Sequence, residues 1–299
     1  MRKGAKLLGA FITVAIIAIG CEPVTQPDIE KNNEIQSQLL DINGLSSHFS
    51  QLDPFTQTEL DNNWEADRQF PSAGVTSVSV FGRDNVAQIG IDNTQTDANT
   101  FRRTEGIKTV GTQNFGTALQ VDLYIEPDWQ DKAVRAGFWV VGDDGSGNRD
   151  ELFGIIEFVS LEPSSSGDSA QGDHVGWRVW DSAIGWVNLG TAFTYGEWVT
   201  LGIELDTDAE EYVYYINGVQ VETAVGGSNF IREAFLNSYN YGLDTFPNFS
   251  NDNYTANWHI GVLNPETKND CKKGGWEEYG FNNQGQCIRF VNTGKDSRN

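Results

Sequence analysis

The stretch DDGSGNRDELFGIIEF, residues 143–158, concentrates side chains that could do chemistry. Oxygen atoms from Asp143, Asp144, Asn148 and Asp150, with glycines that allow tight turns, suit a hard cation such as calcium. The EF-hand spacing is not met, because the glycine falls too early and no Glu stands at the twelfth place. The segment therefore predicts either a calcium loop or a hairpin turn with solvated acids.

Glu157 lies just beyond this loop in an apolar run and is the candidate catalytic acid for glycoside cleavage. Such cleavage needs two carboxyl groups roughly 5–10 Å apart. The residues two positions away on the same face are aliphatic. Glu151, six residues away, lies roughly 20 Å off at ~3.3 Å per residue. We expect no carboxylate pair on this strand, which leaves open a partner from another strand, or an ion pair of Glu157 with Arg178 or Arg149.

Two further runs supply a candidate carbohydrate site. In GWRVWDSAIGW, Arg178 and Trp180 share one face, and FLNSYNYG projects Asn237, Tyr239 and Tyr241 to one side. Aromatic faces stack on sugar rings, while amides and Arg bind hydroxyl groups. The alternative is an aromatic sheet surface that binds nothing. Signatures of other hydrolases are missing from the sequence, with no G-x-S-x-G elbow and no metalloprotease spacing among the three His.

The elements that must position these residues are strands. From about residue 46 to 264, aromatic and β-branched runs alternate with Gly, Asp and Asn clusters, which predicts an all-β sandwich with one core. Asn217-Gly218 predicts a two-residue hairpin turn that pairs Ile216 with Val219 and Tyr214 with Val221. Most of the nine Trp are expected in the core, including those at positions 139 and 198.

One run resembles a known family. EWVTLGIELDTDAEEYVYYINGVQV is similar to the strand, acidic turn, strand and Asn-Gly hairpin of laminin-G-like domains, which belong to the concanavalin A-like lectin and glucanase jelly rolls. LYIEPDW, RAGFWVVG and IIEFVS are similar to exported bacterial proteins of that fold. The resemblance covers about residues 60–262 and implies a jelly-roll sandwich of two antiparallel sheets. The same fold holds lectins, glycoside hydrolases, lyases and adhesion modules, so it leaves the function open.

The first 21 residues predict a leader. Arg2, Lys3 and Lys6 precede a 13-residue apolar run, the length of a signal-peptide core. The run ends in a stretch that resembles a bacterial lipobox, which implies a lipid on Cys21; an ordinary signal peptide is the alternative. Residues 22–45 are polar and predict a tether. We therefore expect an exported protein, held at the bacterial cell envelope or surface by a lipid anchor only.

Residues 265–299 predict a small separate tail. NDCKKGGWEEYGFNNQGQC resembles a Cys-Lys-Lys-Gly-Gly-Trp motif near the C-termini of bacterial surface proteins. With Cys21 lipidated, Cys271 and Cys287 remain to pair in an oxidising compartment. A disulfide closing this loop would stabilise by roughly 3 kcal/mol. Zinc is the weaker alternative, because neither Cys has a close Cys or His companion.

The charge balance excludes one class of partner. The net charge is −22, and −25 without the three leader cations, so the field repels nucleic acid. Extracellular or cell-envelope glycans remain the expected partners, and calcium the expected cofactor if there is one. The sequence favours a surface lipoprotein that binds carbohydrate without cleaving it. The alternatives are a polysaccharide-cleaving hydrolase or lyase of the same fold, with Glu157 as the acid, and an adhesion module that binds another protein.

Overall fold

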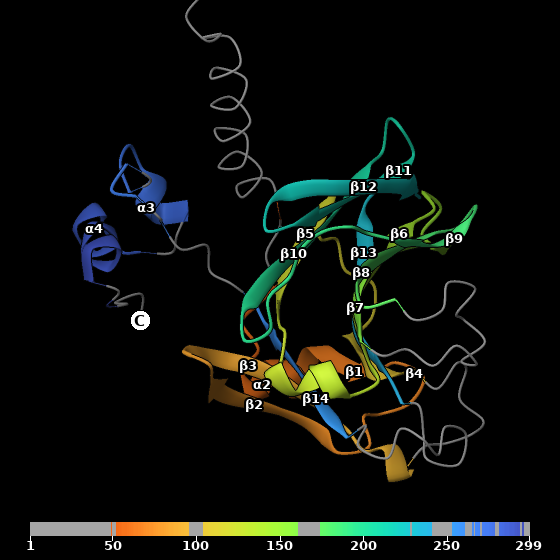
Figure 1. Cartoon of the computed structure of the whole chain (residues 1–299). Helices are drawn as coiled ribbons and strands as arrows, with labels where there is room; N and C mark the ends of the chain where they lie inside the picture. Colours follow the sequence, from red (N-terminus) through yellow and green to blue (C-terminus); the bar gives the residue numbers. More distant parts are fainter. Residues whose placement is uncertain are drawn as a thin grey trace, which may run out of the picture. The chain divides into compact units, whose positions relative to one another are not determined.

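The computed structural model describes residues 49, 52–95, 104–160, 174–227, 229–240, 253–260, 265, 267–269, 271–278, 281–293 and 295. Two antiparallel sheets, each of seven strands, face each other as a jelly-roll-like sandwich (Figure 1). The predicted all-β fold is therefore confirmed. The leader, the tether, Cys21 and Tyr241 lie outside the described residues, and the predictions made for them stay predictions.

The first sheet, here called the β7 sheet, carries most of the candidate residues. Its spatial order is β1 (Trp64–Ala66), β4 (Thr104–Thr109), β13 (Ile231–Tyr239), β6 (Val134–Asp143), β7 (Arg149–Ser160), β8 (Gly176–Asp181) and β9 (Gly185–Asn188).

The second sheet, here called the β5 sheet, closes the other side of the core. Its order is β12 (Val219–Val225), β11 (Glu211–Ile216), β10 (Trp198–Asp206), β5 (Ala118–Tyr124), β14 (Tyr254–His259), β3 (Arg83–Ile91) and β2 (Gly74–Val80). The helical elements described in this body are α2 (Gln57–Asn63) and the 3₁₀ turns η1 (Asn93–Gln95) and η3 (Pro127–Asp131).

The main core forms between the sheets because alternate strand residues point inward. Ile156 and Phe158 of β7 belong to the same buried cluster as Leu123 of β5 and Leu201 of β10, and all four are fully withdrawn from water. Burying each such side chain stabilises the fold by about 1.5–3 kcal/mol. The same alternation turns Glu157, which lies between two core residues, to the outer face of the β7 sheet.

The outer face of the β7 sheet carries a second apolar cluster, made of Trp139, Val141, Ile155, Trp186 and Phe235. The placement expected for Trp139 is corrected, because its neighbours Phe138 and Val140 take the core positions. Trp198 was also expected in the core. It lies half-buried on the outer face of the β5 sheet, since Val199 points inward.

The Asn217-Gly218 hairpin forms as predicted, with φ of 50° and 75° at its two turn residues. Ile216 pairs with Val219, but Tyr214 pairs with Glu222 rather than Val221. The register shifts between Tyr214 and Tyr215, which leaves one extra residue, Val221, in the partner strand. This is a β-bulge, and the side-chain pattern did not predict it.

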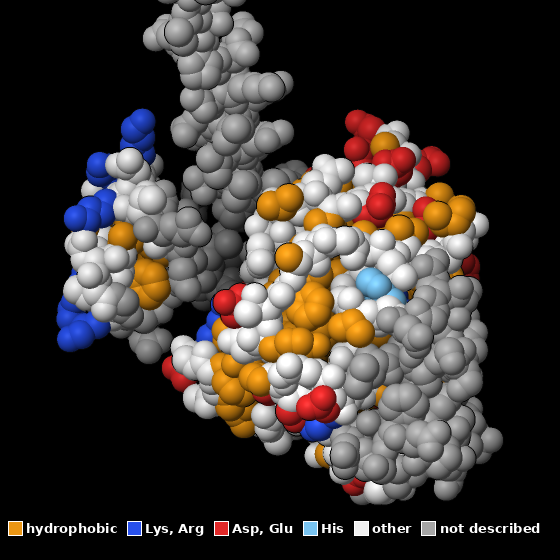
Figure 2. All heavy atoms as spheres, in the orientation of Figure 1, with side chains coloured by type: hydrophobic (Ala, Val, Ile, Leu, Met, Phe, Trp, Pro, Cys, Tyr) orange, Lys and Arg blue, Asp and Glu red, His pale blue; other side chains and the backbone are white. Residues whose placement is uncertain are grey.

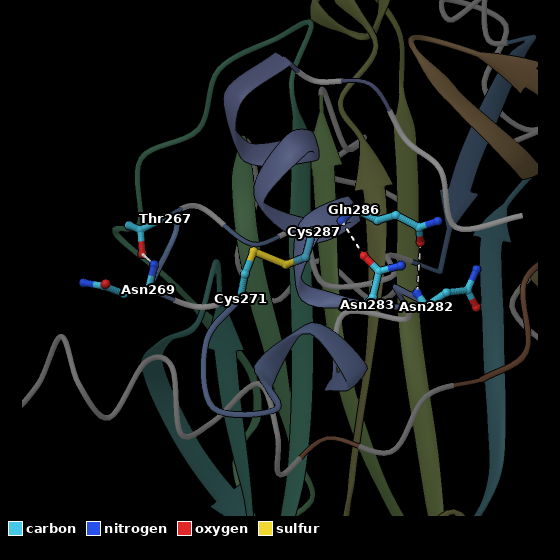
Figure 3. The surroundings of a disulfide bond; sticks show 7 residues. All are labelled: Thr267, Asn269, Cys271, Asn282, Asn283, Gln286 and Cys287. Carbon is cyan, nitrogen blue, oxygen red and sulfur yellow. Dashed lines mark hydrogen bonds between the residues drawn. A yellow bond between two sulfur atoms is a disulfide. The ribbon is translucent and has the colours of Figure 1, made fainter.

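The tail contains α3 (Gly275–Glu278) and α4 (Gln284–Thr293), and the predicted Cys271–Cys287 disulfide is present (Figure 3). Asn283 caps α4, because its Oδ1 accepts a hydrogen bond from the Gln286 amide at 3.0 Å. Both Cys lie buried with Phe281, and Lys and Arg side chains show on the visible face of the tail (Figure 2). No helix among the described residues is both long and apolar enough to cross a membrane.

Candidate active site

A single row of residues crosses the outer face of the β7 sheet. Strand register sets Glu157 beside Gly137 on one side and Arg178 on the other. Beyond Gly137, the next strand contributes Asn237. From β1 outward, the row reads Asp67, Gly106, Asn237, Gly137, Glu157, Arg178 and Asn188. We call it the Glu157 row.

Two glycines in this row leave the room that its polar side chains occupy. A Cβ on Gly137 would come within 2.6 Å of Trp139 Nε1 and 3.1 Å of Glu157 Oε2. A Cβ on Gly106 would come within 2.3 Å of Asn237 Oδ1. Real Cβ atoms do not approach that closely, so the indole N–H and the carboxylate share the space above Gly137 only because no side chain stands there.

Glu157 is held between two arginines. Its Oε1 accepts from Arg178 Nε at 2.6 Å, and its Oε2 accepts from Arg135 Nε at 2.9 Å. The Arg178 guanidinium lies over the Trp186 ring at 4.2 Å. Glu157 and Arg178 are 1 % and 0 % exposed. A charge this deeply buried is tolerated because it is paired and hydrogen-bonded.

Two polar atoms above the row have no partner. Trp139 Nε1, a donor, and Asn237 Oδ1, an acceptor, are buried and make no hydrogen bond within the described part of the chain. Leaving such groups unpaired costs about 1–3 kcal/mol each. Unpaired buried groups of opposite hydrogen-bonding type beside a carboxylate are what a hydroxyl-bearing ligand would satisfy.

Asp67 supplies a second carboxyl group at the far side of the row. Its backbone N–H donates to Gly106 O at 3.0 Å, which aligns it with β4. Asn237 Nδ2 donates to Asp67 Oδ2 at 3.1 Å, and Arg68 pairs with the same oxygen. Arg68 has a φ of 61° and lies over the Trp139 ring at 5.3 Å. A non-glycine residue in this conformation is strained, a state found most often at functional sites.

The structure brings together part of the predicted carbohydrate site. Arg178 and Asn237 lie in the Glu157 row, and Tyr239 lies two residues along β13 from Asn237, with the Arg135 guanidinium 5.5 Å from its ring. Trp180 lies further along β8, next to the Trp186 ring. The predicted ion pair of Glu157 with Arg178 is present. The alternative partner, Arg149, is paired elsewhere, because its Nε lies 3.8 Å from Glu233 Oε2.

The predicted calcium loop forms a hairpin turn between β6 and β7. Asp143 Oδ1 accepts from the Gly145 and Gly147 amides, and Asp144 accepts from Ser146 and Asn148. Asp150 caps the backbone N–H of Leu152. Among the residues that the structure describes, no group of three His, Cys, Asp or Glu side chains is placed to hold a metal ion. Calcium at this loop stays a prediction.

Sequence reasoning missed Asp67, Trp139 Nε1 and Arg135. Asp67 stands in the short segment WEADRQF, where no strand alternation marks a face. Trp139 and Arg135 sit in a mainly apolar strand, every residue of which is buried, so burial shows no alternation there. The only sequence signals for this pair were the charge of Arg135 within an apolar run and the glycine between the two residues.

Comparisons with known proteins concern the fold. Bacillus licheniformis β-glucanase matches with a TM-score of 0.40 and 16% identity, over 70% of this chain and 93% of that one. A β-1,3-1,4-glucanase (lichenase) derived from a mouse hindgut metagenome gives 0.40 and 13%, over 71% and 93%. A β-agarase A in complex with oligoagarose gives 0.37 and 13%, over 72% and 87%. No protein-family model matches the chain, and the search of curated proteins finds no relative.

These findings correct the predicted function. The sequence favoured glycan binding without cleavage, on the premise that Glu157 has no acidic partner. Asp67 does place a second acid in the same row, four strand spacings from Glu157. The solved structures named above are polysaccharide-cleaving enzymes, whereas the favoured prediction was a non-enzyme. The jelly-roll part of the family resemblance is confirmed, while the laminin-G-like assignment stays a prediction.

Proposed function

We propose that this protein cleaves a polysaccharide by glycoside hydrolysis at the outer face of the β7 sheet. One observation carries the proposal: the Glu157 carboxyl group and the unpartnered Trp139 N–H share the space above Gly137, with Asn237 and Asp67 further along the same row. Paired residues of neighbouring strands lie about 4.5–5.5 Å apart. Four such spacings separate Asp67 from Glu157, which is roughly 18–22 Å between their Cα atoms. The two side chains must therefore extend toward each other for their carboxyl groups to reach the roughly 5–10 Å that glycoside hydrolases use.

The surroundings of the two groups suggest separate roles. Glu157 lies between two guanidinium groups, which hold its carboxyl oxygens in fixed positions, so it suits the nucleophile or the base that activates water. Asp67 then acts as the proton donor to the leaving oxygen. This assignment reverses the sequence-based role of Glu157, which was the acid.

The neighbouring polar atoms would position the sugar. The unpartnered Trp139 N–H donates to a ring or hydroxyl oxygen, and Asn237 Oδ1 accepts from a hydroxyl group. Both contacts cost little reorganisation, because the two side chains are already fixed by packing and by the bond from Asn237 to Asp67. The ligand would thus complete hydrogen bonds that the folded protein leaves open.

Water is already excluded from the middle of the Glu157 row. Asn237 is 2 % exposed, and Trp139 is 8 % exposed. A low-polarity surrounding strengthens each electrostatic contact with the reacting groups. It also means that a chain of sugars reaches the row only when this face opens, so short soluble oligosaccharides belong among the first substrates tested.

The test is release of new reducing ends from mixed-linkage β-glucan, laminarin and agarose, and from their oligosaccharides. Wild type should cleave at least one, and Glu157→Gln should lower the rate at least 100-fold, the scale on which nucleophile or base removal acts. Glu65→Gln is the matched control, since Glu65 lies on the same sheet, pairs with Lys108 and stands outside the row. Cleavage of no substrate, or full activity in folded Glu157→Gln, would overturn the proposal.

The same assay separates hydrolysis from elimination. A lyase produces an unsaturated sugar that absorbs ultraviolet light, and it needs no second carboxyl group. Hydrolysis predicts saturated products and a requirement for Asp67. Unsaturated products together with full activity of Asp67→Asn would instead assign the row to a lyase.

A further inference from the structure

A second surface, on the outer face of the β5 sheet, begins at the β2–β3 hairpin. Val80 pairs with Arg83, which leaves Phe81 and Gly82 as a two-residue turn with φ of 52° and 78°. Such turns favour Asn-Gly, because both residues need positive φ. A bulky aromatic residue at the first position is strained. Phe81 is nevertheless 46% exposed, so core packing does not explain why it stands there.

The turn is fixed to the sheet by several contacts. The Phe81 ring stacks on Tyr124 with a centroid distance of 3.8 Å and an interplanar angle of 11°. Trp198 Nε1 donates to Phe81 O at 3.2 Å, and the Arg83 guanidinium lies over the Trp198 ring at 4.4 Å. Arg83 also pairs with Asp122. The hairpin therefore holds one aromatic face toward solvent in a defined position.

Amide side chains continue this surface across the sheet. Register places Trp198, Tyr124, Asn257 and Gln88 on neighbouring strands in one line. Gln88 Nε2 donates to Asn257 Oδ1 at 3.1 Å. Asn257 Nδ2 in turn donates to Glu126 Oε1 at 2.6 Å. The line thus joins the aromatic residues to Glu126, which lies two residues beyond Tyr124, or roughly 7 Å along the chain.

Glu126 lines a cavity of about 320 Å³ at the end of this line. The polar residues around it are Asp92, Asp128, Lys132, Asn253 and Thr255. Burial, followed by the nearby Asp128, raises the pKa of Glu126 to about 7, while Lys132 and Asn257 act in the opposite direction. Near neutral pH its carboxyl group therefore both donates and accepts hydrogen bonds, which suits a hydroxyl-bearing ligand.

We propose that this surface binds a neutral, hydroxyl-rich saccharide chain, with one sugar ring on Phe81 and the hydroxyl groups of a sugar further along the chain in the Glu126 cavity. An exposed, fixed aromatic face followed by planar amides and a polar cavity matches the chemistry of a sugar ring edged by hydroxyl groups. The site lies on the sheet opposite the Glu157 row. It would hold a polymer without cutting it, and it goes beyond the proposed hydrolysis.

The decisive variant is Phe81→Asn, because it removes the aromatic face while creating the favoured Asn-Gly turn. Its melting temperature should equal or exceed that of wild type, whereas affinity for the saccharide should fall at least ten-fold. Ile184→Asn is the matched control, since Ile184 is an exposed apolar residue, 76% exposed, in another hairpin turn. Loss of affinity in Phe81→Asn but not in Ile184→Asn supports the proposal.

Affinity electrophoresis in mixed-linkage β-glucan, laminarin or agarose measures this binding. It is run in an Asp67→Asn background, so that the probe is not consumed. Unchanged retardation of Phe81→Asn overturns the proposal, as does equal loss in Ile184→Asn or retardation by none of the three probes. If wild type cleaves a substrate but Phe81→Asn binds it with unchanged affinity, the saccharide site at Phe81 is wrong and the proposed hydrolysis is still supported.

Discussion

The Nε atom of Arg178 lies 2.6 Å from Glu157 Oε1, and neither side chain reaches water. Removing one partner of a buried pair costs about 3–5 kcal/mol, because the other charge is left behind. Arg178→Met should therefore lower the free energy of unfolding by about that amount in a denaturant titration. Lys108→Met, which removes the half-buried partner of exposed Glu65, should cost less than about 1 kcal/mol. Equal effects of the two substitutions would contradict the account of Glu157.

Gly137→Ala tests the space above the row. The added methyl group would stand 2.6 Å from Trp139 Nε1 and 3.1 Å from Glu157 Oε2, so it should displace one of them and lower cleavage at least ten-fold. Gly190→Ala is the matched control, because a Cβ there meets nothing within 4 Å. Steady-state kinetics on folded proteins, checked by circular dichroism, provide the measurement. Wild-type rates in Gly137→Ala would show that the glycine serves no site.

The pH dependence of stability should report Glu126. Its pKa is raised to about 7 in the folded protein, whereas an unfolded Glu ionises near 4.3. The folded state therefore holds an extra proton between these values, so stability falls as pH rises from about 4.3 to about 7 and the loss is complete above 7. Glu126→Gln removes this loss and should stabilise the protein by about 1 kcal/mol at pH 8, allowing for solvent screening, with little effect at pH 5.

Thermal melts at the two pH values test this prediction. Exposed Glu151 provides the control variant Glu151→Gln, which should shift neither melt. A shift of the same size at pH 5 and pH 8 in Glu126→Gln would mean that its effect does not come from ionisation.

The tail disulfide should control local order. Replacing Cys271 and Cys287 by Ser removes a constraint worth roughly 3 kcal/mol and leaves a small cluster around Phe281. In the Cys-to-Ser protein, mass spectrometry should then detect protease cleavage between positions 271 and 287. This cleavage should occur at protease concentrations that leave the disulfide-bonded wild-type tail intact. Identical cleavage of both proteins would contradict a stabilising role for the bond.

The fold could be predicted from the sequence because its signals are local. Alternation of apolar residues marks the strands, and Asn217-Gly218 marks a hairpin, so the all-β sandwich follows from short-range chemistry. The inward face of β7 also follows, since Ile156 and Phe158 fix the outward direction of Glu157. The β-bulge at Tyr214 was not predicted, because a one-residue register shift does not change the pattern of residue types along the strand.

The site was only half predictable, for a physical reason. The sequence predicted an ion pair of Glu157 with Arg178 or Arg149, and it grouped Arg178 with Asn237 in one candidate sugar site. Their meeting with Asp67 depends on strand order, which puts β4 and β13 between β1 and β6 although these strands are far apart in the sequence. A search for a second acid along one strand could not find a partner that lies across the sheet.

The most direct test of the central claim is the rate at which Asp67→Asn releases reducing ends from the substrate that wild type cleaves. The substitution keeps the size of the side chain and an oxygen that accepts from Asn237, so folding should be preserved. We predict a loss of at least 100-fold, with binding retained. A folded Asp67→Asn protein that cleaves at the wild-type rate would contradict the assignment of Asp67 and Glu157 as the two carboxyl groups of the active site.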